Sequence, residues 1–266
     1  MDDGISETID AFHRGRFHII QPKGRGHRAG MDAMLLASLV ADDRPCRIAD
    51  LGAGAGAAGM AVAARLEKAR VTLYERSPEM AQFARRSLEL LDNAVFSARV
   101  EVREADVTLR AKARVEAGLP DDHFHHVIMN PPYNDAGDRR TPDALKAEAH
   151  AMTEGLFEDW IRTAGAIMIP GGQLSLISRP QSVAEIIAAC GSRFGGIEIT
   201  LIHPRPGEDA VRMLVTAIKG SRARLSFRAP LIMHETGSHA FTPFVDDLNN
   251  GRAAYSRNVR AIRPGL

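Results

Sequence analysis

The stretch RIADLGAGAGAAG, residues 47–59, decides the fold of this chain. Its first five residues form a short apolar run that predicts a buried strand, and the alanine-rich residues 57–69 predict a helix. Glycines between a strand and a helix permit positive φ angles and let the backbone approach a ligand closely. Because the start of a helix also offers free N–H groups, this turn is predicted to bind a ligand.

Beyond this turn, predicted strands and helices alternate as far as residue 190. We expect strands at residues 71–75, 99–106, 125–130 and 171–178, and helices at residues 77–91, 156–168 and 183–190. Residues 197–204 and 211–219 follow as a closing pair of strands with no helix between them. This order predicts an α/β fold with an open, mostly parallel sheet and an antiparallel edge strand.

The composition is that of an ordinary globular protein, with 45% hydrophobic and 25% charged residues in a chain of 266. Two widely separated cysteines, Cys46 and Cys190, argue for a reducing compartment and against a disulfide framework or a thiolate metal site. No window approaches the roughly 20 apolar residues of a membrane span. The acidic N-terminus has no apolar core, so a cytoplasmic protein is expected.

The glycine turn by itself is compatible with two kinds of ligand. Residues 54–59, GAGAAG, fit the dinucleotide fingerprint GxGxxG, and Glu75 ends the next strand as a ribose-binding acid would. Asp50 favours the other ligand, because a carboxylate directly before the glycines would repel a pyrophosphate. It suits the cationic amino-acid end of S-adenosylmethionine. A turn of small residues that only packs a helix on a strand is the plain alternative.

A second motif, HVIMNPPYND at residues 126–135, ends the fourth predicted strand of the sheet. A conjugated NH2 group is a poor nucleophile, and two acceptors that grip its hydrogens would bias its nitrogen toward attack. The side-chain oxygen of Asn130 and the carbonyl of Pro131 can be these acceptors, held rigid by Pro132. Tyr133 can stack on the ring that bears the amine, which contributes about 1–3 kcal/mol per base. The alternative is a strand-ending turn with a structural tyrosine.

Together these two motifs resemble class I S-adenosylmethionine-dependent methyltransferases that act on nitrogen, which have a Rossmann-like, seven-stranded sheet. The resemblance implies that Glu75 holds the ribose hydroxyls and that Asp106 meets the adenine amino group of the cofactor. The full implied set of cofactor-binding residues is Asp32, Asp50, Gly52, Gly54, Gly56, Glu75, Arg76, Asp106, Val107 and Asn130. The implied catalytic residues are Asn130, Pro131, Pro132 and Tyr133. A turn aspartate at position 106 and a solvated strand end at position 75 are the plain alternatives.

The NPPY motif serves three kinds of nitrogen: a protein glutamine amide, guanine N2 and adenine N6. Residues 21–36, QPKGRGHRAGMDAMLL, resemble the N-terminal segment of bacterial tRNA adenine-N6 methyltransferases that act on a valine tRNA. His27 departs from the aromatic residue common there. About 45 residues precede the first core strand, which is short for the helical domain of release-factor enzymes. Asp32 would lie near the methionine end of the cofactor by resemblance, or would simply cap the helix at residues 32–40.

The resemblance divides the chain into three parts. We expect residues 1–46 to cover substrate and cofactor, residues 47–219 to form the catalytic domain, and residues 220–266 to be an extension. In that extension, residues 225–234 look like a hairpin, and a helix is expected to start at Thr242.

Basic residues cluster locally although the formal net charge is only +1. One set is Arg14, Arg16, Lys23, Arg25 and Arg28, and a second is Arg205, Arg212, Lys219, Arg222, Arg224 and Arg228. Such clusters favour contact with RNA phosphates, tRNA being the expected partner, while a solvated face is the alternative. The expected RNA-binding residues are Lys23, Arg25, Arg28, Arg139 and Arg140. The histidines lack a metal-ligand spacing, so no metal is expected.

Overall fold

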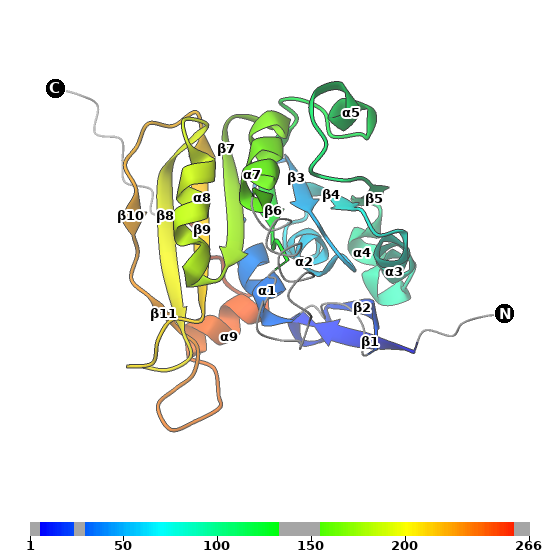
Figure 1. The fold of residues 1–266 in the computed structure, drawn as a ribbon. Coiled ribbons are helices and arrows are strands. Elements are labelled where there is room, and N and C mark those ends of the chain that lie inside the picture. The colour runs from blue at the N-terminus through cyan, green and yellow to red at the C-terminus, as the bar shows by residue number, and fades with distance from the viewer. Residues whose placement is uncertain (1–5, 24–29, 133–154, 258–266) are drawn as a thin grey trace, which may run out of the picture.

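The computed structural model describes residues 6–23, 30–132 and 155–257. A central sheet has the strand order β10-β8-β9-β7-β6-β3-β4-β5, and β11 also pairs with β8. A separate antiparallel pair, β1 and β2, lies near the first helices (Figure 1). The sheet is flanked by helices on both faces, as expected for an α/β chain in which strands and helices alternate.

The strands of the central sheet are β3 (Cys46–Leu51), β4 (Ala69–Glu75), β5 (Val100–Glu104), β6 (Phe124–Met129), β7 (Met168–Ser178), β8 (Phe194–His203), β9 (Arg212–Lys219), β10 (Ser226–Phe227) and β11 (Leu231–Ile232). The α-helices are α1 (Met31–Ser38), α2 (Ala57–Arg65), α3 (Pro78–Leu88), α4 (Ala94–Ser97), α5 (Ala111–Glu116), α7 (Leu156–Ile167), α8 (Val183–Cys190) and α9 (Pro243–Asn249). Short 3-10 turns are η1 (His13–Gly15), η2 (Leu91–Asn93) and η3 (Pro180–Ser182). Every strand and helix predicted between residues 47 and 219 is present.

The predicted Rossmann-like sheet is confirmed, and its seven main strands are all parallel except β9. Strand β9 lies between β7 and β8, so the antiparallel strand is one position in from the edge. The hairpin predicted at residues 225–234 is wrong. The two-residue strands β10 and β11 each pair in parallel with β8 instead of with each other, because the exposed edge of β8 offers the hydrogen-bonding groups.

Alternation along the strands divides the core between the two faces of the sheet. Ile48, Val71, Leu73 and Ile128 belong to one apolar cluster with residues of α1, α2 and α3. Ala49, Leu51, Tyr74, Val127 and Met129 belong to a second cluster with residues of α7 and α8. Each face is thus covered by its own helices (Figure 1), which is the arrangement that buried parallel strands require.

The N-terminal segment packs against α2 and α3, two of the helices that cover one face of the sheet. Strand β1 (Glu7–Phe12), which sequence patterning did not predict, pairs with β2 (Phe17–Pro22). The Ile20 N–H donates to the Ser87 hydroxyl (2.8 Å), and the His18 N–H donates to the Asn93 side chain (3.0 Å). These two bonds attach β2 to α3 and to the turn that follows it.

The C-terminal extension runs along the edge strand β8 and then contacts α1 in the N-terminal segment. As predicted, Pro243 begins a helix, α9, which lies beside α1 (Figure 1). The Tyr255 N–H donates to the Ser38 carbonyl (2.8 Å), and the Tyr255 hydroxyl lies 3.2 Å from the Thr200 hydroxyl of β8. Within the described ranges, no helix combines the length and apolarity needed to cross a membrane.

Candidate functional site

Four adjacent parallel strands bring the predicted site residues to one edge of the sheet. Leu51 of β3 lies opposite Tyr74 of β4 on one side and opposite Met129 of β6 on the other. The next residues along these strands are Gly52, Glu75 and Asn130. Asp106 follows β5, the neighbour of β4, so the turn, both acids and the asparagine share the carboxyl edge where ligands of such sheets bind.

The glycine turn uses the conformations that only glycine adopts easily. Gly52, Gly54 and Gly56 have φ angles of 68°, 57° and 90°. The N–H groups of Gly52 and Ala53 both donate to the Tyr74 carbonyl (2.8 and 3.0 Å), which draws the turn over the end of β4. A Cβ atom on Gly54 would meet only the Met80 methyl group, at 3.9 Å, so the turn is open at that point.

Glu75 is fixed by two backbone donors. One carboxylate oxygen accepts the Gly54 N–H and the other accepts the Ser77 N–H, each at 2.8 Å. Ser77 also caps α3, since its hydroxyl accepts the Met80 N–H (3.4 Å). Each carboxylate oxygen has a second lone pair, so Glu75 can still accept hydrogen bonds from a ligand diol.

Asp50 lies beneath the turn and is only 2% exposed. Its carboxylate accepts the Gly59 N–H (2.8 Å), which holds the first turn of α2 against β3. Burial raises the pKa of Asp50 to about 7, the charge of Glu75 adds to the rise, and the Gly59 hydrogen bond opposes it. The structure therefore gives Asp50 an internal bond within the turn, and its contact with a cofactor stays a prediction.

Asp106 and Val107 form the turn after β5. One oxygen of Asp106 accepts both the N–H and the hydroxyl of Thr108, at 2.8 and 2.7 Å. Val107 is buried, and its carbonyl accepts the Thr163 hydroxyl of α7 (2.7 Å). Arg76 follows Glu75 and is exposed. The carboxylate of Asp106 is thus oriented by its own turn, beside the end of β4.

The NPP part of the NPPY motif stands at the end of β6, next to the glycine turn. Asn130 is half-buried, Pro131 is buried and Pro132 is exposed. Since Met129 lies opposite Leu51, Asn130 emerges beside Gly52. Several predicted residues lie outside the described ranges, namely Tyr133, Arg25, Arg28, Arg139 and Arg140.

The prediction that Asp32 caps its helix is wrong. Helix α1 begins at Met31 after Gly30, and no side chain caps it, so Asp32 lies inside the first turn. Its carboxylate instead pairs with the Arg212 guanidinium at the start of β9 (2.8 Å). This ion pair connects α1 to the sheet near its carboxyl edge, because β9 runs antiparallel to its neighbours.

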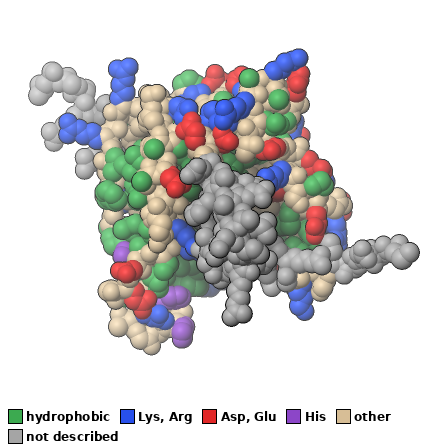
Figure 2. Space-filling view, in the orientation of Figure 1, with side chains coloured by type: hydrophobic (Ala, Val, Ile, Leu, Met, Phe, Trp, Pro, Cys, Tyr) green, Lys and Arg blue, Asp and Glu red, His purple; other side chains and the backbone are tan. Residues whose placement is uncertain are grey.

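Many of the clustered basic residues have carboxylate partners within the protein. The pairs are Arg14 with Asp246, Arg212 with Asp32, Lys219 with Asp122 and Arg228 with Glu198. On the face shown in Figure 2, side chains of both charges lie side by side near the top of the view. On α7, Asp159 pairs with Arg162 and also with Arg110. Lys23 is exposed at the end of β2. Clustering along the chain is therefore a weaker sign of RNA contact here than the sequence suggested.

Trp160 is a site residue that sequence reasoning missed. This side chain of α7, the chain's one tryptophan, is 7% exposed and lies directly against Gly52. A Cβ atom on Gly52 would come within 2.3 Å of the indole ring. No local sequence motif predicts this contact, because α7 and the glycine turn are far apart in sequence and meet only in the folded protein.

The polar groups at this edge of the sheet fit S-adenosylmethionine better than a dinucleotide. Glu75 places a carboxylate at the turn, where a pyrophosphate would bring further negative charge. Glu75 can accept bonds from a ribose diol, and the space at Gly54 leaves room for a ligand against the backbone. In the part of the chain that the structure describes, no group of three or more His, Cys, Asp or Glu side chains could hold a metal ion.

Comparisons with known proteins agree with this reading. Residues 29–199 match the family model described as the methyltransferase small domain. A crystal structure titled a predicted O-methyltransferase from Agrobacterium tumefaciens is 84% identical, covers 86% of this chain and all of that one, and superposes with a TM-score of 0.77. A protein of Pedobacter heparinus named tRNA1(Val) (adenine(37)-N6)-methyltransferase is 26% identical over 77% of this chain and 83% of its own.

A release factor glutamine methyltransferase of Deinococcus radiodurans is 30% identical, over 53% of this chain and 49% of its own length. The family match covers more than half of the chain and includes α1, the glycine turn, the acids and Asn130. The chain therefore belongs to the methyltransferase small domain family, and its methyl donor is S-adenosylmethionine.

Proposed function

We propose that this protein methylates the N6 amine of adenine in an RNA, and that this RNA is a tRNA. The observation that carries the proposal is the position of Asn130 and Pro131, which stand at the end of β6 beside the glycine turn. Two acceptors next to a methyl donor site suit a planar NH2 group, whose two hydrogens they can hold.

The residues of the chain then have separate roles. Glu75 and Asp106 hold the ribose and the adenine of the cofactor, and the open turn at Gly54 admits it. Bound there, S-adenosylmethionine would supply an electrophilic methyl carbon on a sulfonium. As the new N–C bond forms, the C–S bond would break, S-adenosylhomocysteine would leave as a neutral thioether, and the amine would release one proton to solvent. Asn130 and Pro131 orient the amine, and rigid acceptors contribute by positioning and by electrostatic preorganisation. The target base has to leave its stack to reach this edge of the sheet.

In this proposal residues 47–219 perform the transfer and residues 1–46 cover part of substrate and cofactor. The choice of adenine in tRNA is supported by the relatives of that name, which match over most of their length. A protein glutamine amide is the second candidate, because it too is a conjugated NH2 group and a release-factor enzyme matches half of this chain. Guanine N2 is the third acceptor of this class.

The decisive experiment supplies the purified protein with isotope-labelled S-adenosylmethionine and either total tRNA or total protein. The tRNA is then digested, and the modified nucleosides are fragmented in a mass spectrometer to locate the label. We expect label on the base of adenosine. Label on guanine, on a ribose hydroxyl or in protein alone would overturn the assignment to adenine N6.

Variants of Asn130 test its role separately from cofactor binding. Asn130→Ala removes one acceptor, so methyl transfer should be abolished while the affinity for S-adenosylhomocysteine stays nearly unchanged. Asn130→Asp keeps an acceptor oxygen at the same place and should retain part of the activity. Wild-type turnover in Asn130→Ala would exclude this residue from the transfer.

A further inference from the structure

A row of arginines crosses the amino edge of the sheet, opposite the edge that holds the site. Arg47 of β3 lies directly opposite Arg70 of β4. Arg99 comes next in the row, because it precedes Val100, which pairs with Val71, and its carbonyl accepts the Val71 N–H (2.9 Å). Three neighbouring strands therefore carry an arginine at the same level, at or next to their first residue.

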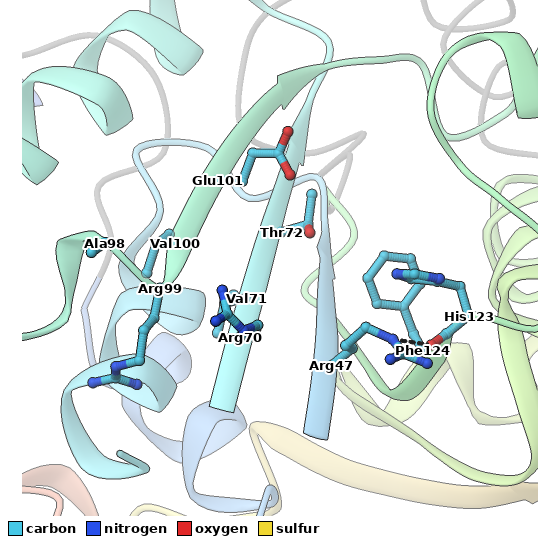
Figure 3. A pocket seen from close by; sticks show the side chains of 10 residues that line it. All are labelled: Arg47, Arg70, Val71, Thr72, Ala98, Arg99, Val100, Glu101, His123 and Phe124. Atoms are coloured by element: carbon cyan, nitrogen blue, oxygen red, sulfur yellow. Dashed lines mark hydrogen bonds between the residues drawn. The ribbon is translucent and has the colours of Figure 1, made fainter. Parts of the chain in front are cut away.

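These arginines border a depression with a volume of about 300 Å³. Figure 3 shows Arg47 on one side of the depression and Arg99 on the other, with Arg70 between them. His123, Thr72 and Glu101 complete its polar lining. The depression is large enough for a small ligand, and three of its side chains are arginines, which donate hydrogen bonds and cannot accept them.

The charges in the row are poorly compensated. Arg70 is exposed and makes no ion pair with any residue in the described ranges. Arg47 donates from Nε to the His123 carbonyl (2.8 Å), which orients its guanidinium and leaves its terminal nitrogens without a carboxylate among the described residues. Glu101 is the one acid in the lining, and it is already paired with Arg103 (2.8 Å).

Arg99 has a clear structural role and Arg47 a smaller one, through its bond to the His123 carbonyl, whereas Arg70 has no such bond among the described residues. The Arg99 guanidinium donates to the carbonyls of Ala63 and Leu66 at the end of α2 and to that of Ala69 at the start of β4. Like charges directly opposite one another on neighbouring strands destabilise a sheet. Two facing arginines with no acid paired to either among the described residues therefore cost stability, and a shared anion would remove that cost.

We propose that Arg47 and Arg70 bind a phosphate group, and that in the working complex this is a backbone phosphate of the RNA, a step that rests on the RNA substrate of the proposed function. Neighbouring strands are about 4.8 Å apart, so both guanidinium groups can reach one phosphate. Arg47 lies five residues before Gly52. At about 3.3 Å per residue, this places the phosphate contact roughly 17 Å from the glycine turn. Such a contact would fix the register of the RNA without reading its sequence.

The first test measures binding of total tRNA to the full chain at several salt concentrations, with no methyl transfer involved. Arg70→Ala and Arg47→Ala should each weaken binding about fivefold and lower the slope of log affinity against log salt by about 1. Lys112→Ala is the matched control, because it removes one equally charged side chain that is 88% exposed on α5. It should leave the slope unchanged. Equal slopes in all four proteins would overturn the RNA contact.

The second test uses inorganic phosphate and follows the side-chain Nε–H signals of arginine by NMR. In the wild type, phosphate should shift the signals of Arg47 and Arg70, and Arg70→Ala should abolish the shift at Arg47. Phosphate shifts without any change in the tRNA slope would assign the site to a free phosphate compound and overturn the RNA source. Absence of both effects would overturn the site itself.

Stability measurements separate this role from a structural one. Because it relieves repulsion, Arg70→Ala should not lower the free energy of unfolding, whereas loss of a structural arginine would. The outcome is also distinct from that of the proposed function. A tRNA contact at Arg70 can hold even if adenine proves not to be the methylated base.

Discussion

The indole ring of Trp160 lies against Gly52, at a distance that leaves no room for a side chain at position 52. The contact joins α7 to the glycine turn on the face of the sheet that α7 and α8 cover. It means that Gly52 is required for two reasons, its positive φ angle and its close approach to the ring. Gly54 meets only the first of these requirements, since its surroundings are open.

Substitution of the two glycines should therefore have unequal effects. Gly54→Ala should cost roughly 1–2 kcal/mol, the penalty for a left-handed residue with a side chain. Gly52→Ala should cost about 1–3 kcal/mol more, because the Trp160 ring must also move. Urea unfolding followed by circular dichroism would measure both, and equal losses would contradict the contact.

Glu75 is expected to lose its role in cofactor binding when its carboxylate is replaced by an amide. In Glu75→Gln the new NH2 group must face the N–H of Gly54 or Ser77, which disturbs the turn and removes an acceptor for the ribose. We expect at least a tenfold loss of affinity for S-adenosylhomocysteine, about 1.4 kcal/mol. Calorimetric titration would measure this loss.

Glu104→Gln is the matched control for that experiment. Glu104 pairs with Glu75 in the strand register, but it is exposed and bound to Arg85 (2.7 Å). Its amide variant should bind S-adenosylhomocysteine like the wild type. A similar loss of affinity in both variants would mean that the effect is general to this strand end.

Asp50 should make the stability of the protein depend on pH. Its folded pKa of about 7 lies above the ordinary value of 3.8, so between these values the folded state holds a proton that the unfolded state releases. The free energy of unfolding should therefore fall as pH rises from about 4 to about 7, by an amount on the order of a few kcal/mol. Asp50→Asn can still accept the Gly59 N–H and should flatten this dependence. An unchanged pH profile in the variant would contradict the raised pKa.

The ion pair between Asp32 and Arg212 should contribute modestly to stability. Both side chains are partly exposed, at 22% and 28%, so solvent screens their attraction. A double-mutant cycle with Asp32→Ala and Arg212→Ala should give a coupling of about 0.5–1 kcal/mol that shrinks in high salt. The more exposed pair of Lys112 and Glu116, at 88% and 63%, should give a smaller coupling energy. Zero coupling would mean that the pair does not anchor α1.

The sequence predicted those features that depend on neighbouring residues. Alternating apolar runs, the glycines after β3 and the two prolines after β6 act through local backbone preferences, so the order of strands and helices followed from them. The placement of Glu75, Asp106 and Asn130 at one edge followed as well, because parallel strands end together. Errors arose where local patterns were ambiguous, as at Asp32, whose helix starts one residue earlier than predicted.

Only the tertiary structure decided which distant residues meet. The register between β3 and β4 places Arg47 opposite Arg70, and the packing of α7 brings Trp160 to Gly52. The burial of Asp50, and with it the raised pKa, also depends on layers contributed by the whole chain. These relationships are set by how strands pair and helices pack, which no short stretch of sequence encodes by itself.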